Sequence, residues 1–338
     1  MKTQTKILMT FIILPIAFTI FGCKKDYKTI TKINPDGSCE RTFIVTTGSK
    51  NTDVTVLPLP YDSTWQTKWV KDTSSSGDYI LTAKKYFDSY TDLCNLYDRN
   101  NKPDMMKVNL KIEKKFRWFF TFYKYDEKYN KFNLFNIVPV SEFLTQKEID
   151  DYTTGRSDST IEAKVKKWEE RNYLEDFVDA IIKAAVKLND PSLTEKMIND
   201  KKEVLFKMLA DSKGDSDSLT SELNSIFNTK VFFKLKDVIR NENNSITKRA
   251  ERMFDAEGNY TNSVLMPGII IKTNADRIEG NKVAWDFTSK RFTIKDFEMK
   301  AESRIMNLWA VYTSALILIL IIAALLIPVV KQKKNIGL

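Results

Sequence analysis

The chain has 338 residues, a formal net charge of +9, three cysteines and no histidine. Without histidine the commonest general base and the usual middle member of a serine triad are missing, and the cysteines lack the spacing of an ordinary zinc site. The charge does not indicate a nucleic-acid partner, because five of the nine excess charges come from the chain ends, at Lys2, Lys6, Lys331, Lys333 and Lys334.

Residues 1–23 have the pattern of an export signal. Lys2 and Lys6 precede an uncharged, largely apolar stretch at residues 7–22, and Cys23 follows Gly22. At about 1.5 Å per residue the stretch spans about 24 Å, which is short for a hydrocarbon core of about 30 Å. Gly22-Cys23 resembles the cleavage site of bacterial lipoproteins, although Phe21 is larger than the residue usual there. We predict a lipoprotein signal peptide with lipid on Cys23, with an uncleaved signal anchor as the alternative.

Residues 24–140 carry a β pattern. Asn34-Pro35-Asp36-Gly37 separates two alternating stretches and predicts a hairpin of residues 28–33 and 39–46. Weaker patterns favour strands at 54–57, 64–70 and 79–83, and a short helix or turn at 88–99.

The strongest strand pattern covers residues 107–125. Val108, Leu110 and Ile112 alternate, and aromatic residues at 116, 118, 120 and 122 continue the same parity, with others on the opposite face. This predicts one strand that is covered on both sides, or that presents an apolar-ligand wall. The candidate wall residues are Trp118, Phe120 and, from a later strand, Trp285.

Residues 141–255 change to a helical period and are predicted to be a helical insertion. Thr145 with Glu148 and Ser159 with Glu162 have the spacing of capping boxes, and Ser192 with Glu195 opens a third helix. A polar loop at 211–218 precedes a further helix at about 219–239.

Residues 256–305 return to a β pattern and are predicted to complete the sheet of the first part. The predicted strands are residues 269–273, 283–287 and 292–294, with a hairpin turn at 279–281. Residues 308–330 carry no charge and predict a transmembrane helix, with Trp309 and Tyr312 at the entry side. Lysines after the span place residues 331–338 in the cytoplasm and residues 24–307 outside.

Cys39 and Cys94 remain once the lipidation site is set aside. Outside the cytoplasm they could form a disulfide, which would stabilise the fold by about 4 kcal/mol on the chain-entropy model. Two buried thiols are the alternative.

No catalytic, cofactor or metal motif emerges. Residues 211–222 have the length of a calcium-binding loop, but Gly214 is at the fourth position instead of the sixth. The adjacent pairs Asp150-Asp151 and Glu169-Glu170 point in different directions on a helix and form no acid/base couple. We therefore predict no cofactor, no metal and no enzymatic activity.

Several short motifs together resemble the LppM-like group of bacterial membrane-anchored lipoproteins, which extends to Bacteroides-type bacteria. They are the export signal, Asp36-Gly37, Pro267-Gly268, Val283-Ala284-Trp285 and the single C-terminal span with basic residues after it. The resemblance implies an α+β domain held at the membrane, contact with lipids or envelope components, and no catalytic residues.

The sequence as a whole predicts the α+β class: an antiparallel sheet from N- and C-terminal strands, an inserted helical block and one C-terminal transmembrane helix. Two separate domains are the alternative architecture. We expect a lipoprotein of the cytoplasmic (inner) membrane whose periplasmic or extracellular domain binds lipid, another apolar ligand or an envelope protein. A carboxylate-dependent cell-envelope hydrolase is the alternative function.

Overall fold

The computed structural model describes residues 25–48, 62–72, 78–99, 107–131, 136–211, 216–255 and 258–336. The predicted signal peptide with Cys23 and the weak strand pattern at 54–57 lie outside these ranges.

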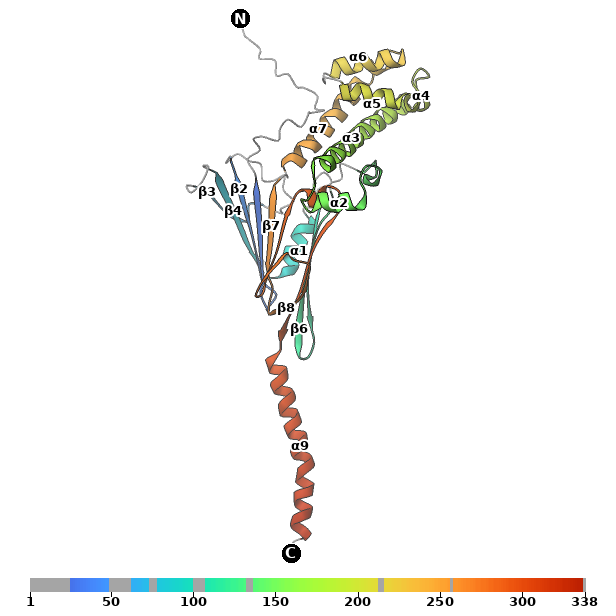
Figure 1. Ribbon diagram of the computed structural model, residues 1–338. Coiled ribbons are helices and arrows are strands. Elements are labelled where there is room, and N and C mark those ends of the chain that lie inside the picture. Colours follow the sequence, from blue (N-terminus) through green and yellow to red (C-terminus); the bar gives the residue numbers. More distant parts are fainter. Residues whose placement is uncertain are drawn as a thin grey trace.

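The strands form two sheets (Figure 1), so the single predicted sheet is divided. The larger sheet has the order β3-β4-β2-β1-β7-β10-β9, and the smaller has the order β5-β6-β11-β8. The larger sheet comprises β1 (Asp26–Ile33), β2 (Cys39–Thr47), β3 (Gln66–Lys71), β4 (Tyr79–Phe87), β7 (Asn259–Leu265), β9 (Arg277–Glu279) and β10 (Lys282–Thr288). The smaller comprises β5 (Val108–Phe116), β6 (Phe120–Tyr129), β8 (Ile269–Thr273) and β11 (Phe297–Met306). The predicted α+β class with antiparallel sheets is confirmed.

The predicted first hairpin is present as β1 and β2, which pair from Ile33 opposite Cys39 to Asp26 opposite Thr46. Its turn is closed by the Gly37 amide, which donates to the Asn34 carbonyl at 3.0 Å, and Gly37 has a φ of 106°. The Asp36 carboxylate accepts from the Ser38 hydroxyl at 2.8 Å and from the Ser38 amide at 2.9 Å, and these two hydrogen bonds lower the pKa of Asp36 below its usual value. Glycine is needed here because few other residues adopt such a positive φ.

N- and C-terminal strands share the larger sheet through a parallel pair. β1 lies beside β7, with Asp26 next to Asn259 and Lys32 next to Leu265. β7 leads through a short turn into β8, whose first residue, Ile269, pairs with Arg304 near the end of β11. Strand β1 therefore starts at the helical-block end of the sheet and runs toward the C-terminal helix (Figure 1).

A large apolar core fills the space between the sheets and includes helix α1 (Tyr90–Arg99), which contributes Leu93 and Tyr97. Alternate side chains of the central strands face inward, as the burial of β2 illustrates: the odd positions from 39 to 47 are all buried. This alternation is the period-2 pattern on which the strand predictions rested.

The insertion is helical, as predicted, and stands at the end of the sheets away from the C-terminal helix (Figure 1). It contains α2 (Gln146–Thr153), α3 (Ser159–Leu188), α4 (Glu195–Asp200), α5 (Lys202–Asp211), α6 (Ser216–Phe227) and α7 (Lys236–Asp255), with short 3-10 turns η2 (Val140–Glu142) and η3 (Val231–Phe233). Helices α3 to α7 have a core of their own, and a smaller cluster including Trp168 and Ile294 connects α3 to the residues before β11.

The further helix predicted at about 219–239 is divided into α6 and α7, with η3 between them. Three helix caps were also predicted, and one is as predicted. Thr145 and Glu148 form the capping box of α2. Helix α3 is capped by Asp158, whose carboxylate accepts from the Ile161 amide at 2.9 Å, and α4 is capped by Thr194. The predicted caps at Ser159 and Ser192 are therefore wrong: in each case a second residue able to cap lies nearby, and sequence spacing alone does not choose between them.

Two strand predictions are wrong. Residues 107–125 form β5, a tight turn and part of β6, because Arg117 and Phe120 exchange backbone hydrogen bonds of 2.8 and 3.1 Å. The predicted strand at 292–294 is instead the end of α8 (Lys290–Thr293), where the Phe292 amide donates to the Ser289 carbonyl.

Helix α9 (Leu308–Ile336) extends away from the sheets (Figure 1). Its segment Leu308–Leu326 has a mean hydropathy of 2.5, and only 6% of the most apolar window in it is buried. By length and composition the helix can cross a membrane, which indicates a membrane-associated protein.

Candidate functional site

An ion pair lies fully buried between the two sheets. Arg41 of β2 donates from Nη2 to Oε1 of Glu127 on β6 at 2.6 Å, and both side chains are 0% exposed. Arg41 also donates to the Tyr97 hydroxyl of α1 at 2.7 Å and to the Tyr125 hydroxyl at 3.0 Å. We call Thr31, Arg41, Tyr97, Tyr125, Glu127 and Asn262 the interior polar cluster.

The interior polar cluster joins both sheets and α1. The Thr31 hydroxyl of β1 accepts from Nη1 of Arg41, and Asn262 of β7 donates to Oε2 of Glu127 at 2.7 Å. Among the described residues, Nε of Arg41 and Oδ1 of Asn262 have no hydrogen-bond partner. A buried polar atom without a hydrogen bond has lost its contact with water and gained no other partner. These two atoms therefore reduce the stability of the folded state.

Burial and charge hold Arg41, Tyr97 and Tyr125 in fixed protonation states. Burial alone would lower the pKa of Arg41, but the Glu127 carboxylate and the nearby tyrosines raise it well above its usual value. Burial is also the main reason that the pKa values of Tyr97 and Tyr125 are raised. The guanidinium stays charged and the phenols stay neutral near pH 7, so none of these three side chains exchanges a proton readily.

Strand parity was the available sequence signal for this cluster. Arg41 shares the parity of the inward residues Cys39 and Phe43, and Glu127 shares that of Tyr125 and Tyr129. The predicted strand at 107–125 ended before Glu127, and a charged residue at an inward position is normally assigned to an exposed face. The cluster was therefore missed.

A second feature surrounds Asn307, the one residue between β11 and α9. Its amide donates to the Phe119 carbonyl at 2.8 Å, and its side-chain Nδ2 donates to the carbonyls of Arg117 at 2.8 Å and Trp118 at 3.1 Å. The Thr121 hydroxyl donates to Oδ1 of Asn307 at 2.9 Å. Asn307 therefore fixes the tip of the β5–β6 hairpin, residues 117–119, to the start of α9.

Aromatic side chains extend this junction outward. The Phe116 and Trp309 rings stack at 6.2 Å, the Trp118 and Trp309 rings meet edge to face at 5.3 Å, and Nε1 of Trp118 donates to the Ser314 hydroxyl at 2.8 Å. We call Phe116, Trp118, Phe119, Trp309 and Tyr312 the aromatic platform. Each of its side chains is between 45% and 70% exposed, so the platform lies on the surface and is not part of the core.

The structure does not bring the predicted wall residues together. Trp285 is buried in the core, where it stacks on Tyr125 at 6.2 Å and donates to Asn274 at 3.0 Å. Trp118 belongs to the aromatic platform, and Phe120 lies on the outer face of the smaller sheet beneath the guanidinium of Arg304 at 4.7 Å. The three side chains therefore lie apart, because the turn at 117–119 separates Trp118 from the strand that was expected to carry it, and a role in ligand binding for any of them stays a prediction.

The thiols of Cys39 and Cys94 are both free. Burial is the main cause that raises the pKa of Cys39 to about 12 and that of Cys94 to about 11, and the charge of Cys94 contributes to the Cys39 value. A disulfide between Cys39 and Cys94 remains a prediction. The lipid on Cys23 also remains a prediction, since that residue lies outside the described ranges.

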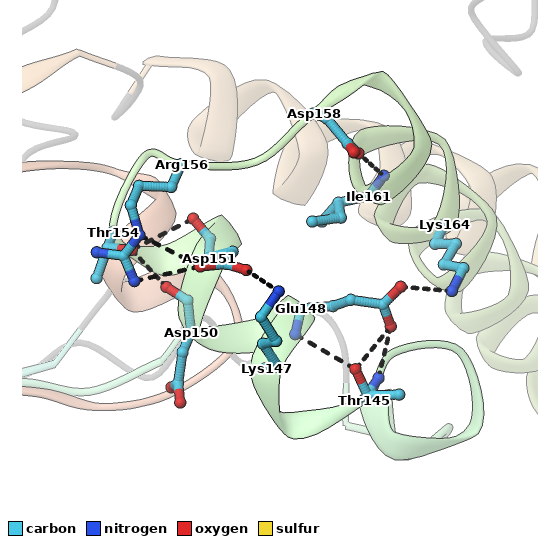
Figure 2. Close-up of polar contacts among 10 residues, drawn as sticks. All are labelled: Thr145, Lys147, Glu148, Asp150, Asp151, Thr154, Arg156, Asp158, Ile161 and Lys164. Carbon is cyan, nitrogen blue, oxygen red and sulfur yellow. Dashed lines mark hydrogen bonds and ion pairs between the residues drawn. The ribbon is translucent and has the colours of Figure 1, made fainter.

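The adjacent carboxylates Asp150 and Asp151 point apart on α2 (Figure 2). Asp151 pairs with Arg156 at 3.2 Å, and Asp150 pairs with Lys295 at 2.8 Å, which with Gln146 lowers the pKa of Asp150. Lys164 and Thr145 lower the pKa of the neighbouring Glu148 to about 2. The lowered pKa values keep Glu148 and Asp150 ionised near neutral pH, so neither is prepared to donate a proton there.

Within the described ranges, no group of three or more Cys, Asp or Glu side chains could hold a metal ion. The sequence matches no protein family and no curated protein. A solved structure that it loosely resembles is the NMR structure of the folded domain of LppM from Mycobacterium tuberculosis, with 12% identity and a TM-score of 0.33. That comparison covers 85% of this chain and 94% of the LppM chain.

Proposed function

We propose that the chain is a membrane-tethered lipoprotein whose folded part acts outside the cytoplasmic membrane as a non-enzymatic binding module. Its partner would be a lipid, another apolar ligand or a protein of the bacterial cell envelope. In a cell with two membranes this part would lie in the periplasm.

The junction at Asn307 is the observation that supports the proposal most. β11 ends at Met306 and α9 begins at Leu308, and Asn307 is held by hydrogen bonds to the neighbouring hairpin. No loose linker separates the folded part from the apolar helix. A module that binds a freely diffusing substrate does not need a fixed position relative to α9. A module that binds a partner in or beside the membrane does.

The protonation states support a binding role over catalysis. The tyrosines of the interior polar cluster have raised pKa values, and the carboxyl groups on α2 at Glu148 and Asp150 have lowered ones. A general acid or base works best with a pKa near the working pH, and these groups are displaced from it.

The two predicted anchors would enter at opposite ends of the folded part: α9 follows β11 of the smaller sheet, and the lipid would precede β1 of the larger sheet. Cys23 lies three residues before Asp26, and Asp26 is at the helical-block end of β1. The eight residues of β1 span about 26 Å at 3.3 Å per residue. A lipid on Cys23 would therefore join the chain at the end of β1 that lies away from α9. Without the lipid, α9 alone holds the domain.

Topology can be measured with alkaline phosphatase, which is active only outside the cytoplasm. Fusion after Lys300 is expected to give an active enzyme, and fusion after Lys334 an inactive one, because Lys331, Lys333 and Lys334 retain the tail inside. Activity in the reverse pattern would overturn the proposed orientation.

The lipid form of the proposal is tested by mass spectrometry on residues 24–305, purified from envelope extracts without α9. We expect specific lipids above the level found on beads taken through the same extract. Removing α9 matters because a membrane span carries bulk lipid with it. Recovery of no lipid above background would contradict the lipid form of the proposal and leave an envelope protein as the partner.

A further inference from the structure

We propose that the tip of the β5–β6 hairpin is immersed in the headgroup layer of the membrane that α9 enters, where it contacts anionic lipid. The inference rests on the proposed placement of α9 across a membrane. It adds a second contact with the bilayer, made by residues that lie almost 200 positions before the helix in the chain.

The depth of the tip follows from its contacts with α9. Trp118 donates to Ser314, which lies six residues after Leu308, the first residue of the helix. Six residues of helix advance about 9 Å along its axis. The Trp118 indole is therefore level with the second turn of α9 and not with its beginning, so a membrane that receives Leu308–Leu326 also receives the hairpin tip.

The exposed atoms of the tip have the chemistry of the membrane interface. Trp118 is 45% exposed and Phe119 is 46% exposed, even though Trp118 packs on Trp309. Tryptophan and tyrosine are enriched at the headgroup level, where an apolar ring and a polar N–H or O–H group are both accommodated. Continuity of this surface with α9 identifies its occupant as lipid, because any other occupant would have to share the same space with the bilayer.

The charges on the tip itself and on the start of α9 are of one sign, and Asp36 of the β1–β2 turn is a negative charge near Lys114. Lys114, Lys115 and Arg117 precede or form the turn, and Arg304 lies on the adjacent strand. Residues 114–122 and 303–318 contain no Asp or Glu. Basic side chains beside a membrane attract anionic headgroups. The tip therefore combines apolar rings for the interface with positive charge for lipid phosphates.

Photocrosslinking of the full chain in lipid nanodiscs tests the inference. The photoreactive residue benzoylphenylalanine replaces Phe119 in one variant and Phe233, which is 56% exposed in the helical block, in the control. The nanodiscs contain phosphatidylglycerol and phosphatidylethanolamine. We expect lipid adducts at position 119 and none above background at position 233, with thermal unfolding of both variants unchanged from the parent.

Absence of lipid adducts at position 119, or equal adducts at both positions, would overturn the inference. A second variant pair tests the charges: in K115Q/R117Q the yield at position 119 is expected to fall in nanodiscs containing phosphatidylglycerol and to stay unchanged in phosphatidylcholine alone. An unchanged yield in both would overturn the anionic contact. The adducts form with bulk lipid, so this result is independent of any lipid that co-purifies with residues 24–305.

Discussion

Replacing Arg41 by methionine is expected to lower the free energy of unfolding by about 3–5 kcal/mol, because the Glu127 carboxylate would be left buried without its charged partner. Both side chains are 0% exposed, so water cannot take over the lost contact in the folded state. Urea unfolding of the full chain in detergent micelles, followed by near-ultraviolet circular dichroism of the buried aromatic residues, measures the change.

A surface ion pair between β2, which also carries Arg41, and the neighbouring strand β4 provides the matched control. Lys84 and Glu40 are 2.7 Å apart, and their side chains are 46% and 31% exposed. Lys84→Met removes the same type of contact in water and is expected to cost only about 0–1 kcal/mol. If Arg41→Met lowers the free energy of unfolding no more than Lys84→Met does, the buried ion pair stabilises the fold no more than the surface pair, and the prediction is wrong.

A double variant separates the ion pair from the space that it fills. Arg41→Met with Glu127→Leu removes both charges and replaces them with apolar side chains. We expect this variant to be more stable than Arg41→Met alone, because a buried pair replaced as a whole is often neutral or better. The comparison also tests whether the cluster serves to align the two sheets, in which case the double variant would unfold over a broader urea range.

Features encoded by nearby residues could be predicted from the sequence. The first hairpin depends on Asn34 to Gly37, and the start of α2 depends on Thr145 and Glu148; both are present as predicted. The apolar helix was evident from 308–330 for the same reason, since length and composition are properties of one segment. The alternation of buried and exposed side chains along the core strands likewise follows from local sequence patterns.

Features that depend on distant partners could not be predicted. The turn at 117–119 contains Arg, Trp and Phe, and none of these is a typical turn residue, so the aromatic alternation ran through it unbroken. The division into two sheets depends on β1 pairing with β7 across more than 200 residues. Asn307 had no distinguishing pattern, because its importance comes from carbonyls of another hairpin.

Gly268, in the turn between β7 and β8, is expected to be strongly sensitive to substitution because it packs against the end of β11. It has a φ of +78°, and a Cβ there would lie 2.2 Å from the Arg304 carbonyl oxygen and 2.7 Å from Cγ1 of Ile305. Alanine at positive φ costs about 1–2 kcal/mol, and the overpacking adds about 1–3 kcal/mol. Gly268→Ala is therefore expected to unfold at a clearly lower urea concentration than the parent.

Gly280→Ala isolates the steric part of this effect. Gly280 has a φ of +64°, similar to that of Gly268, but no atom lies within 4 Å of a Cβ placed on it. Both alanine variants therefore have the same cost of a positive φ. Only at Gly268 does the added Cβ also meet β11, just before the Asn307 junction. Unfolding of both variants at the same urea concentration would show that the turn can move away from β11. A larger loss for Gly268→Ala would show that the turn and the strand leading into α9 are held together as one rigid unit.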